Sequence, residues 1–121
     1  MKHISELEIT LSYFFNWNKA RLNCLTQILQ ALFVVRTVNL TQIAAAFQTN
    51  AKEESSYRRV CRFFTNFSFD LSSIVLLVLR LFPFNDKYLL ILDRTNWKWG
   101  KTPINILMLS VAFMGISIPL F

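Results

Sequence analysis

Apolar residues recur at helical spacing through the first part of the chain. The pattern is present over residues 4–15 and again over residues 19–36, and it places the apolar side chains on one side of an α-helix. A shorter apolar pattern predicts a short helix over residues 39–47, and the polar residues 48–50 predict a turn after it. The chain is therefore expected to begin with helices.

The next helix has a recognisable start. Asn50 is a residue type that caps helices, and Glu53 follows it where an acidic side chain can satisfy exposed amide groups. We expect this helix to run over residues 51–67. A further apolar helix is expected over residues 70–82, ending at Pro83, because proline has no amide hydrogen with which to continue it.

The pattern changes character near residue 85. Residues 87–93 form a compact apolar run of strand length, residues 104–113 form a second, and residues 117–121 begin a third. Gly115 supplies a turn between the last two runs. Helices followed by strands predict an α+β fold.

The same change of pattern predicts the domain organisation. Residues 1–85 are expected to form a helical region with about five helices, and residues 86–121 to begin a second domain with about two or three antiparallel strands. The chain holds only 2 glycines and 3 prolines, which argues against a disordered or loop-rich protein.

The composition is unusually apolar. Hydrophobic residues make up 54% of the 121 residues, and the mean hydropathy is +0.39. Two explanations stay open: residence in a membrane, or apolar surface that is meant to meet residues outside this sequence. Residues 104–121 are uncharged over roughly the length that a spanning helix needs. Gly115 and Pro119 interrupt that run where a strand–turn–strand needs them, so we expect no membrane partner.

The charge points to a polyanionic partner. Lysine and arginine number 13 against 7 acidic residues, which gives a net charge of +6. Nucleic acid and anionic lipid are the partners that such an excess favours. Cys24 and Cys61 lie in apolar helical patterns without a metal-binding motif, and they are interpreted as reduced thiols of a cytoplasmic protein. The first ten residues do not resemble a secretory signal.

The helix expected over residues 51–67 has a basic side. On a helical wheel Arg58, Arg59 and Arg62 gather on one side and face solvent. The opposite side carries apolar residues: Tyr57, Val60, Cys61, Phe63, Phe64 and Phe67. A short helix, a turn and this helix follow one another in the order of a helix-turn-helix.

Two interpretations of the basic side stay open. The three arginines can contact DNA phosphates or guanine edges, or they can simply form a solvated face. The surrounding charge favours DNA, and with it a helical DNA-binding region over residues 1–85, because two acids, Glu53 and Glu54, stand against a larger set of basic residues in this region. That set comprises Lys19, Arg21, Arg36, Lys52, Arg58, Arg59 and Arg62.

Asp93 ends the first apolar run of strand length. A carboxylate on a buried strand is costly unless it is paired, hydrogen-bonded or bound to a cation. Polynucleotidyl transferases use such a carboxylate to hold two divalent metal ions, which activate the attacking oxygen and stabilise the leaving one. The simpler alternative is a strand-end aspartate that pairs with Arg94 or Lys98.

The sequence around Asp93 resembles a known family. The stretch LILDRTNWKWGK (residues 90–101), followed by INILM at 104–108 and GISIPL at 115–120, is similar to the start of the catalytic domain in DDE transposases of the insertion-sequence-4 type. Residues 57–64 resemble the helical amino-terminal region of the same proteins. The resemblance implies a ribonuclease-H-like fold whose Asp, Asp, Glu triad binds Mg²⁺, and enzymes that cut DNA at transposon ends and join it to a target.

By this resemblance Asp93 corresponds to the first catalytic carboxylate and to a metal ligand. The second aspartate, the final glutamate and the family's later Tyr, Arg, Glu and Lys signature have no counterpart here. Asp70 and Asp86 precede the strand and cannot replace them. One carboxylate cannot organise two metal ions, so we expect at most DNA binding from this polypeptide and no stable Mg²⁺ site.

Further expectations follow from the resemblance. For the full-length members of the family, the resemblance implies a homodimer. An incomplete ribonuclease-H-like sheet would have an open edge and an uncovered apolar face, and these two features favour aggregation. The alternatives to a transposase fragment are a short DNA-binding regulator that competes for transposon ends and a small membrane protein.

Overall fold

The computed structural model describes residues 2–84 and 87–121, and its contacts divide the chain into two compact units, Met1–Ser68 and Phe69–Phe121. The boundary expected from the sequence after residue 85 lies outside the described ranges. Within the described residues the division between the two units falls earlier, after Ser68, because the last helix packs against the strands. That helix therefore belongs to the second unit, although its composition resembles that of the first.

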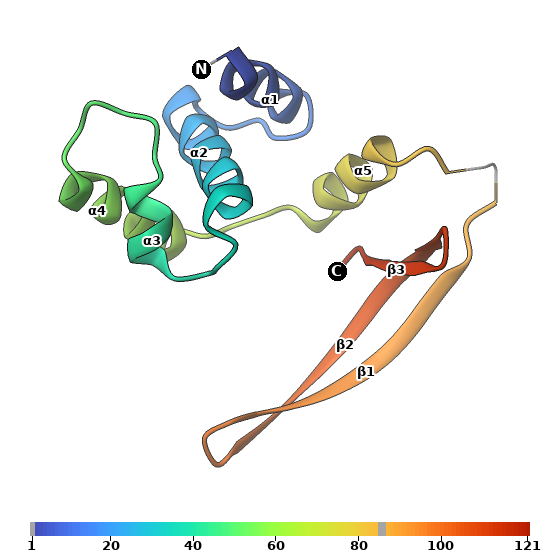
Figure 1. The fold of residues 1–121 in the computed structure, drawn as a ribbon. Helices are drawn as coiled ribbons and strands as arrows, with labels where there is room; N and C mark the ends of the chain where they lie inside the picture. The colour runs from blue at the N-terminus through green and yellow to red at the C-terminus, as the bar shows by residue number, and fades with distance from the viewer. Residues whose placement is uncertain (1, 85–86) are drawn as a thin grey trace. The chain divides into compact units, whose positions relative to one another are not determined.

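The first unit consists of helices α1 (Lys2–Ser12), α2 (Lys19–Val35), α3 (Leu40–Ala45) and α4 (Glu53–Thr65) (Figure 1). All four occur where the apolar spacing predicts them, with ends that differ by a few residues. Helix α2 contacts each of the other three helices. It is therefore the centre of this unit.

The core of the first unit is built from the apolar positions of these helices and of the segments that join them. Leu11 and Val60 are the most completely buried large apolar side chains in this unit, at 2% and 0% exposure. Burying one such side chain contributes roughly 1.5–3 kcal/mol. Further members of this core are Ile4, Phe15, Leu22, Cys24, Leu25, Ile28, Ala31, Ile43, Ala44, Phe47 and Phe63.

The start of α4 differs from the prediction. The residue at its N-cap is Lys52, whose side chain makes no capping hydrogen bond, so the expectation that Asn50 caps this helix is wrong. Glu53 and Glu54 occupy the first turn instead. Their carboxylates stabilise the positive end of the helix dipole, which allows the helix to begin without a capping side chain.

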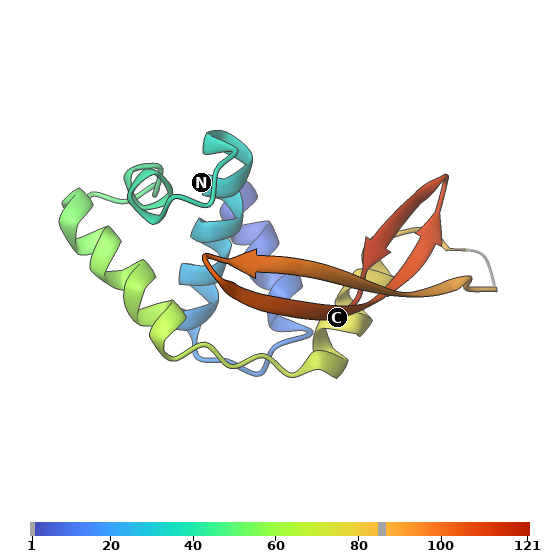
Figure 2. The same ribbon diagram turned by 90° about the horizontal axis from the view of Figure 1, so that it is seen from below.

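The second unit consists of helix α5 (Leu71–Leu81) and strands β1 (Leu90–Trp99), β2 (Thr102–Phe113) and β3 (Ile116–Pro119). The strands form one antiparallel sheet in the order β1-β2-β3 (Figure 2). The α+β class and the antiparallel strands are thus as predicted. Strand β1 is longer than expected.

Helix α5 covers one end of one face of this sheet. Its Val75, Val78 and Leu79 pack against a small buried cluster on the last two strands. That cluster consists of Val111, Ile118 and Leu120. The remainder of the sheet, towards the turn between β1 and β2, has no comparable cover within the described part of this unit, and every residue of β1 is exposed.

The uncharged run at 104–121 forms strand, turn and strand. Met114 and Gly115 occupy the turn between β2 and β3 with φ angles of 48° and 79°, which confirms the turn predicted at Gly115. Among the described residues, none of the helices combines the length and the apolar character needed to cross a membrane.

Candidate nucleic-acid interface

The buried side of α4 is narrower than the helical wheel suggests. Ser56, Val60 and Phe63 are buried, whereas Tyr57 and Phe64 are each 41% exposed. The spacing of the buried residues places the centre of the packed side near Ser56. Phe67 is 55% exposed, so three of the six apolar positions face solvent more than the sequence predicts.

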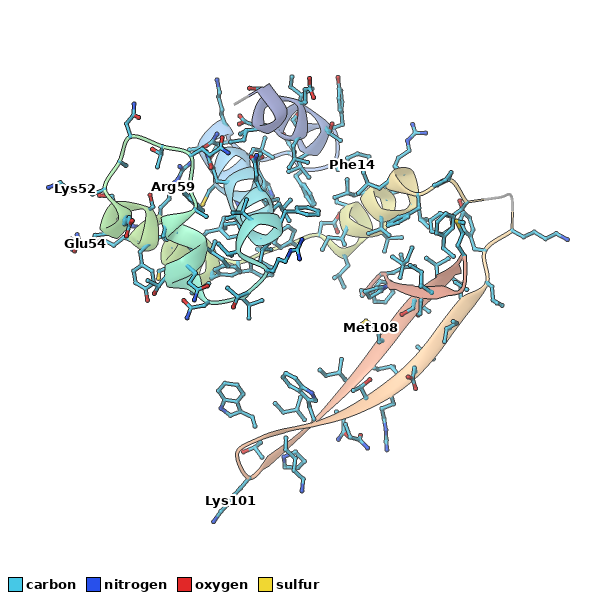
Figure 3. All side chains as sticks on the ribbon, in the orientation of Figure 1. Phe14, Lys52, Glu54, Arg59, Lys101 and Met108 are labelled. Carbon is cyan, nitrogen blue, oxygen red and sulfur yellow. The ribbon has the colours of Figure 1, made fainter. Side chains whose placement is uncertain are left out.

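Arg59 lies at the border of this packed side and is half-buried. Its Nη2 atom donates hydrogen bonds to the carbonyl oxygen of Ala20 at 3.1 Å and to Oδ1 of Asn23 at 2.9 Å, which connects α4 to α2 (Figure 3). Nδ2 of Asn23 in turn donates to Oε2 of Glu8 on α1 at 2.9 Å. The expectation that Arg59 faces solvent is therefore corrected: it also links three helices.

Arg58 and Arg62 occupy the exposed side of α4, as the wheel predicts. They are four positions apart, so their side chains project from neighbouring turns of the helix. Arg58 forms an ion pair with Glu54, one turn earlier, and both side chains are mostly exposed. Such an exposed pair is weak, so a phosphate can compete for Arg58.

Arg21 joins this group, although the sequence pattern alone does not mark it as a site residue. Its guanidinium carbon lies 4.4 Å from the ring centroid of Trp17 and 5.3 Å from that of Phe63. Its Nη2 atom donates to the carbonyl oxygen of Asn66 at the end of α4, at 2.9 Å. Trp17 precedes the cap of α2, so its contact with Arg21 does not follow from helical spacing, and the approach of Phe63 is a tertiary contact.

The start of α2 lies beside these residues. Asn18 caps the helix, and its Oδ1 atom accepts a hydrogen bond from the backbone amide of Arg21 at 2.9 Å. The capped end carries the positive pole of the helix dipole. Guanidinium groups and a helix start therefore add positive potential to the same part of the first unit.

Helices α3 and α4 pack against each other in the order expected of a helix-turn-helix. Residues 46–52 connect them. That connection is longer than the three- to four-residue turn typical of the motif. The arrangement is thus a pair of packed helices with a basic second helix.

Asp93 lies in the middle of β1, opposite Met108 of β2. Its Oδ1 atom accepts a hydrogen bond from the backbone amide of Arg94 at 2.8 Å, and the residue is exposed. Two expectations are corrected: the strand does not end at Asp93, and the carboxylate is not buried. The reason is that residues up to Trp99 pair with β2, and β1 is an edge strand that no described element of the second unit covers on the side of Asp93.

The side of the sheet that carries Asp93 is otherwise largely apolar. Side chains alternate along a strand, so Ile91, Trp97 and Trp99 share the side of Asp93. Cross-strand pairing adds further residues to this side: Ile104, Ile106 and Met108. Trp97 is 60% exposed and Trp99 is 74% exposed. The second unit thus presents an extended apolar surface around one carboxylate.

The described residues contain no group of three or more metal-ligating side chains. Asp70, the other acidic residue in the described part of the second unit, caps α5 and accepts hydrogen bonds from Ser73. Asp93 therefore stands as a single exposed carboxylate on its strand.

The thiol of Cys24 lies near the positively charged side chains between α2 and α4. Burial raises the pKa of this thiol, and the positive charges of Arg59 and Arg21 act in the opposite direction. Cys24 is buried in the first unit, and its Sγ atom lies 4.0 Å from the carbonyl oxygen of Arg59.

No protein-family model, curated protein or solved structure matches this chain.

Proposed function

We propose that the chain is the amino-terminal part of a DDE transposase of the insertion-sequence-4 type, and that its first unit binds DNA at transposon ends. The family assignment is supported by the resemblance at residues 90–101 and 57–64. DNA binding is the part of this function that residues 1–121 can perform by themselves.

The observation that carries the DNA-binding proposal is the exposed side of α4. Arg58 and Arg62 present guanidinium groups from adjacent turns, and Arg59 lies beside them. One guanidinium group can donate two parallel hydrogen bonds to the oxygens of a phosphate, and arginine also makes the commonest specific contact with the edge of guanine. The net charge of +6 adds attraction that does not depend on DNA sequence.

The second unit corresponds, in this proposal, to the first strands of a ribonuclease-H-like sheet. Three antiparallel strands with Asp93 on the first of them support this assignment. The exposed Trp97 and Trp99 also support it, because surface of this kind is normally covered by further elements. Asp93 is then the first carboxylate of the triad.

Mg²⁺ does not fit the residues described around Asp93. The carboxylate is exposed, it accepts a hydrogen bond from its neighbour Arg94, and no second acidic side chain lies with it in the described part of the chain. Mg²⁺ in such enzymes needs several oxygen ligands in an octahedral arrangement. We therefore assign no catalytic step to this polypeptide.

DNA binding can be tested by titrating the chain against a labelled random-sequence duplex at several salt concentrations. We expect binding whose log K falls linearly with log salt concentration, by about 0.9 for each phosphate that the protein neutralises. Replacing both Arg58 and Arg62 with Ala should weaken binding and reduce this slope by about one for each phosphate that is no longer neutralised.

The matched control removes the same charge from the second unit. Arg80 and Arg94 are both exposed, so the double variant R80A/R94A has the same net charge as R58A/R62A. It should bind the duplex nearly as well as the unaltered chain. Equal losses of affinity in the two double variants would mean that DNA binding depends on the net charge alone. That result would reject the exposed side of α4 as the DNA interface.

The catalytic part of the proposal has a separate test. The chain is incubated with the duplex and millimolar Mg²⁺ or Mn²⁺, beside the variant Asp93→Asn. We expect no nicking from either protein, because one carboxylate cannot hold two metal ions. Metal-dependent nicking that disappears in Asp93→Asn would contradict this expectation.

A further inference from the structure

A pocket of about 520 Å³ lies between the start of α2 and the last turns of α4, entirely within the first unit. Arg21, Arg59 and Arg62 all line it, and none of its lining residues is acidic. The other lining residues are Asn18, Ala20, Cys24, Phe63 and Asn66. Three guanidinium groups around one pocket repel one another, and a bound anion would offset this repulsion.

We propose that this pocket binds one phosphate group of the DNA backbone, held by Arg21, Arg59 and Arg62. The inference rests on the proposed DNA-binding function and deepens it, because it adds Arg21 and a defined phosphate position to the exposed side of α4. It also divides the arginines of α4 into two kinds: Arg62 lines the pocket, whereas Arg58 does not.

Two of the three guanidinium groups are positioned before a ligand arrives. Arg21 stacks against Trp17 and Phe63 and donates to Asn66, and Arg59 donates to Ala20 and Asn23. Positions fixed in advance reduce the entropy lost on binding, and planar guanidinium groups match the oxygens of a phosphate. The pocket therefore has the organisation of an anion site.

Donor groups remain for the anion. A guanidinium has five N–H groups, and the hydrogen bonds of Arg21 and Arg59 within the described part of the chain are made by Nη2 alone. Nε of Arg21 has no hydrogen-bond partner among the described residues, but it is buried, so an anion in the pocket would contact the Nη groups of this side chain.

The start of helix α2 also favours an anion in this pocket. Asn18 and Ala20, at its start, line the pocket together with the arginines. The first amides of a helix and its dipole favour a negative group at this position. The start of α2 and the three guanidinium groups therefore meet at this pocket.

The first measurement uses the full chain and inorganic phosphate. Phosphate should raise the thermal unfolding midpoint, followed by circular dichroism, relative to chloride at equal ionic strength, because a ligand of the folded state stabilises it. Arg62→Ala should lose most of this shift, and Arg58→Ala, which removes the same charge one turn away, should keep it. The proposed phosphate site would be rejected if phosphate did not raise the unfolding midpoint of the unaltered chain, or if both variants lost this increase equally.

The second measurement needs no variant. Nuclear magnetic resonance of the Nε–H group of Arg21 is recorded with inorganic phosphate and then with the random-sequence duplex. Both should move this resonance. A duplex that binds but leaves the Arg21 resonance unmoved would overturn the inference while the proposed function stands. A response to phosphate without any duplex binding would reject the DNA backbone as the source, and with it the proposed function.

Discussion

Arg59 shows how a single side chain on a basic helix can connect that helix to its neighbours. It reaches the carbonyl oxygen of Ala20 and the side chain of Asn23, and through Asn23 it is connected to Glu8. Arg58, the preceding residue, pairs only with Glu54 on its own helix among the described residues. Two adjacent arginines therefore have different roles in stability.

Replacing Arg59 with Ala should lower the free energy of unfolding of the first unit by about 1–3 kcal/mol, because it removes two hydrogen bonds between α4 and α2 and takes this donor from the half-buried Oδ1 of Asn23. Arg58→Ala should change it by less than about 0.5 kcal/mol, as expected for an exposed surface pair. Urea unfolding followed by helical circular dichroism measures both. Similar values for the two variants would argue against the link between α4 and α2.

The helical wheel predicts that Arg59 faces solvent, but it does not predict the contacts that Arg59 and Arg21 make with other segments of the chain. The wheel places Arg59 among the solvent-facing arginines because it treats every position opposite the apolar stripe alike. Its half-buried position depends on Ala20 and Asn23, which lie far away in sequence. The role of Arg21 likewise depends on Phe63, so neither role can be deduced from local spacing.

At the scale of elements, helices were predicted better than strand ends. Helix α5 begins after a capping residue and ends before Pro83, and both signals are local. Strand β1 extends beyond Asp93 because residues 94–99 pair with β2, although Asn96 and Lys98 make this stretch look like a loop in the sequence. Pairing partners, and not local propensity, decide where a strand ends.

The turn between β2 and β3 offers a matched pair of substitutions. Met114 has a φ of 48° and is 87% exposed, so its replacement removes little packing. Met114→Asn creates Asn-Gly, the preferred pair for such a turn, and should stabilise the second unit by about 0.5–1 kcal/mol. Gly115→Ala, at a φ of 79°, should destabilise it by about 1–2 kcal/mol.

The measurement for both substitutions is the thermal unfolding midpoint of the second unit. A Cβ atom on Gly115 meets no other atom within 4 Å, so any destabilisation in Gly115→Ala comes from the backbone and not from a clash. Shifts of the same sign in the two variants would mean that positive φ does not determine the stability of this turn.

The cap of α5 makes the second unit sensitive to acid. Hydrogen bonds from the Ser73 side chain and backbone amide lower the pKa of Asp70 below its usual value. A carboxyl group whose pKa is lower in the folded state contributes stability above its unfolded pKa, and this stability is lost as the pH falls through the folded pKa. The destabilisation should therefore occur below about pH 4.

Asp70→Asn separates this effect from general acid unfolding. Asparagine caps helices about as well as aspartate but carries no titrating charge. The unfolding midpoint of the variant should fall less between about pH 5 and pH 2 than that of the unaltered chain. Parallel curves for the two proteins would rule out a contribution from the cap.

At the scale of the whole molecule, the first unit has an extensive buried core, whereas the buried core beside the sheet of the second unit is small. Side chains on both faces of β1 are exposed, including Leu92 at 66% and Trp97 at 60%. An exposed edge strand with apolar side chains is a template for pairing with another chain. The expectation of poor solubility made from the sequence remains a prediction, and the exposed strand indicates where self-association would begin.

Replacing Trp97 and Trp99 with Lys should reduce self-association at high protein concentration, because charges on an edge strand oppose pairing. Phe33→Lys is the control: Phe33 is 84% exposed but belongs to the first unit. Sedimentation velocity over a range of concentrations measures the effect. If Phe33→Lys is as effective as the strand variant, self-association does not depend on β1.

The placement of the 3 tryptophans has a practical consequence. Trp17 lies against Phe15 and under the guanidinium of Arg21 in the first unit, whereas Trp97 and Trp99 project into solvent from the second. The two environments should give indole fluorescence of different wavelength and different accessibility to quenchers. Each unit thus carries its own optical reporter, so melting of the helices and of the sheet can be followed separately without any added label.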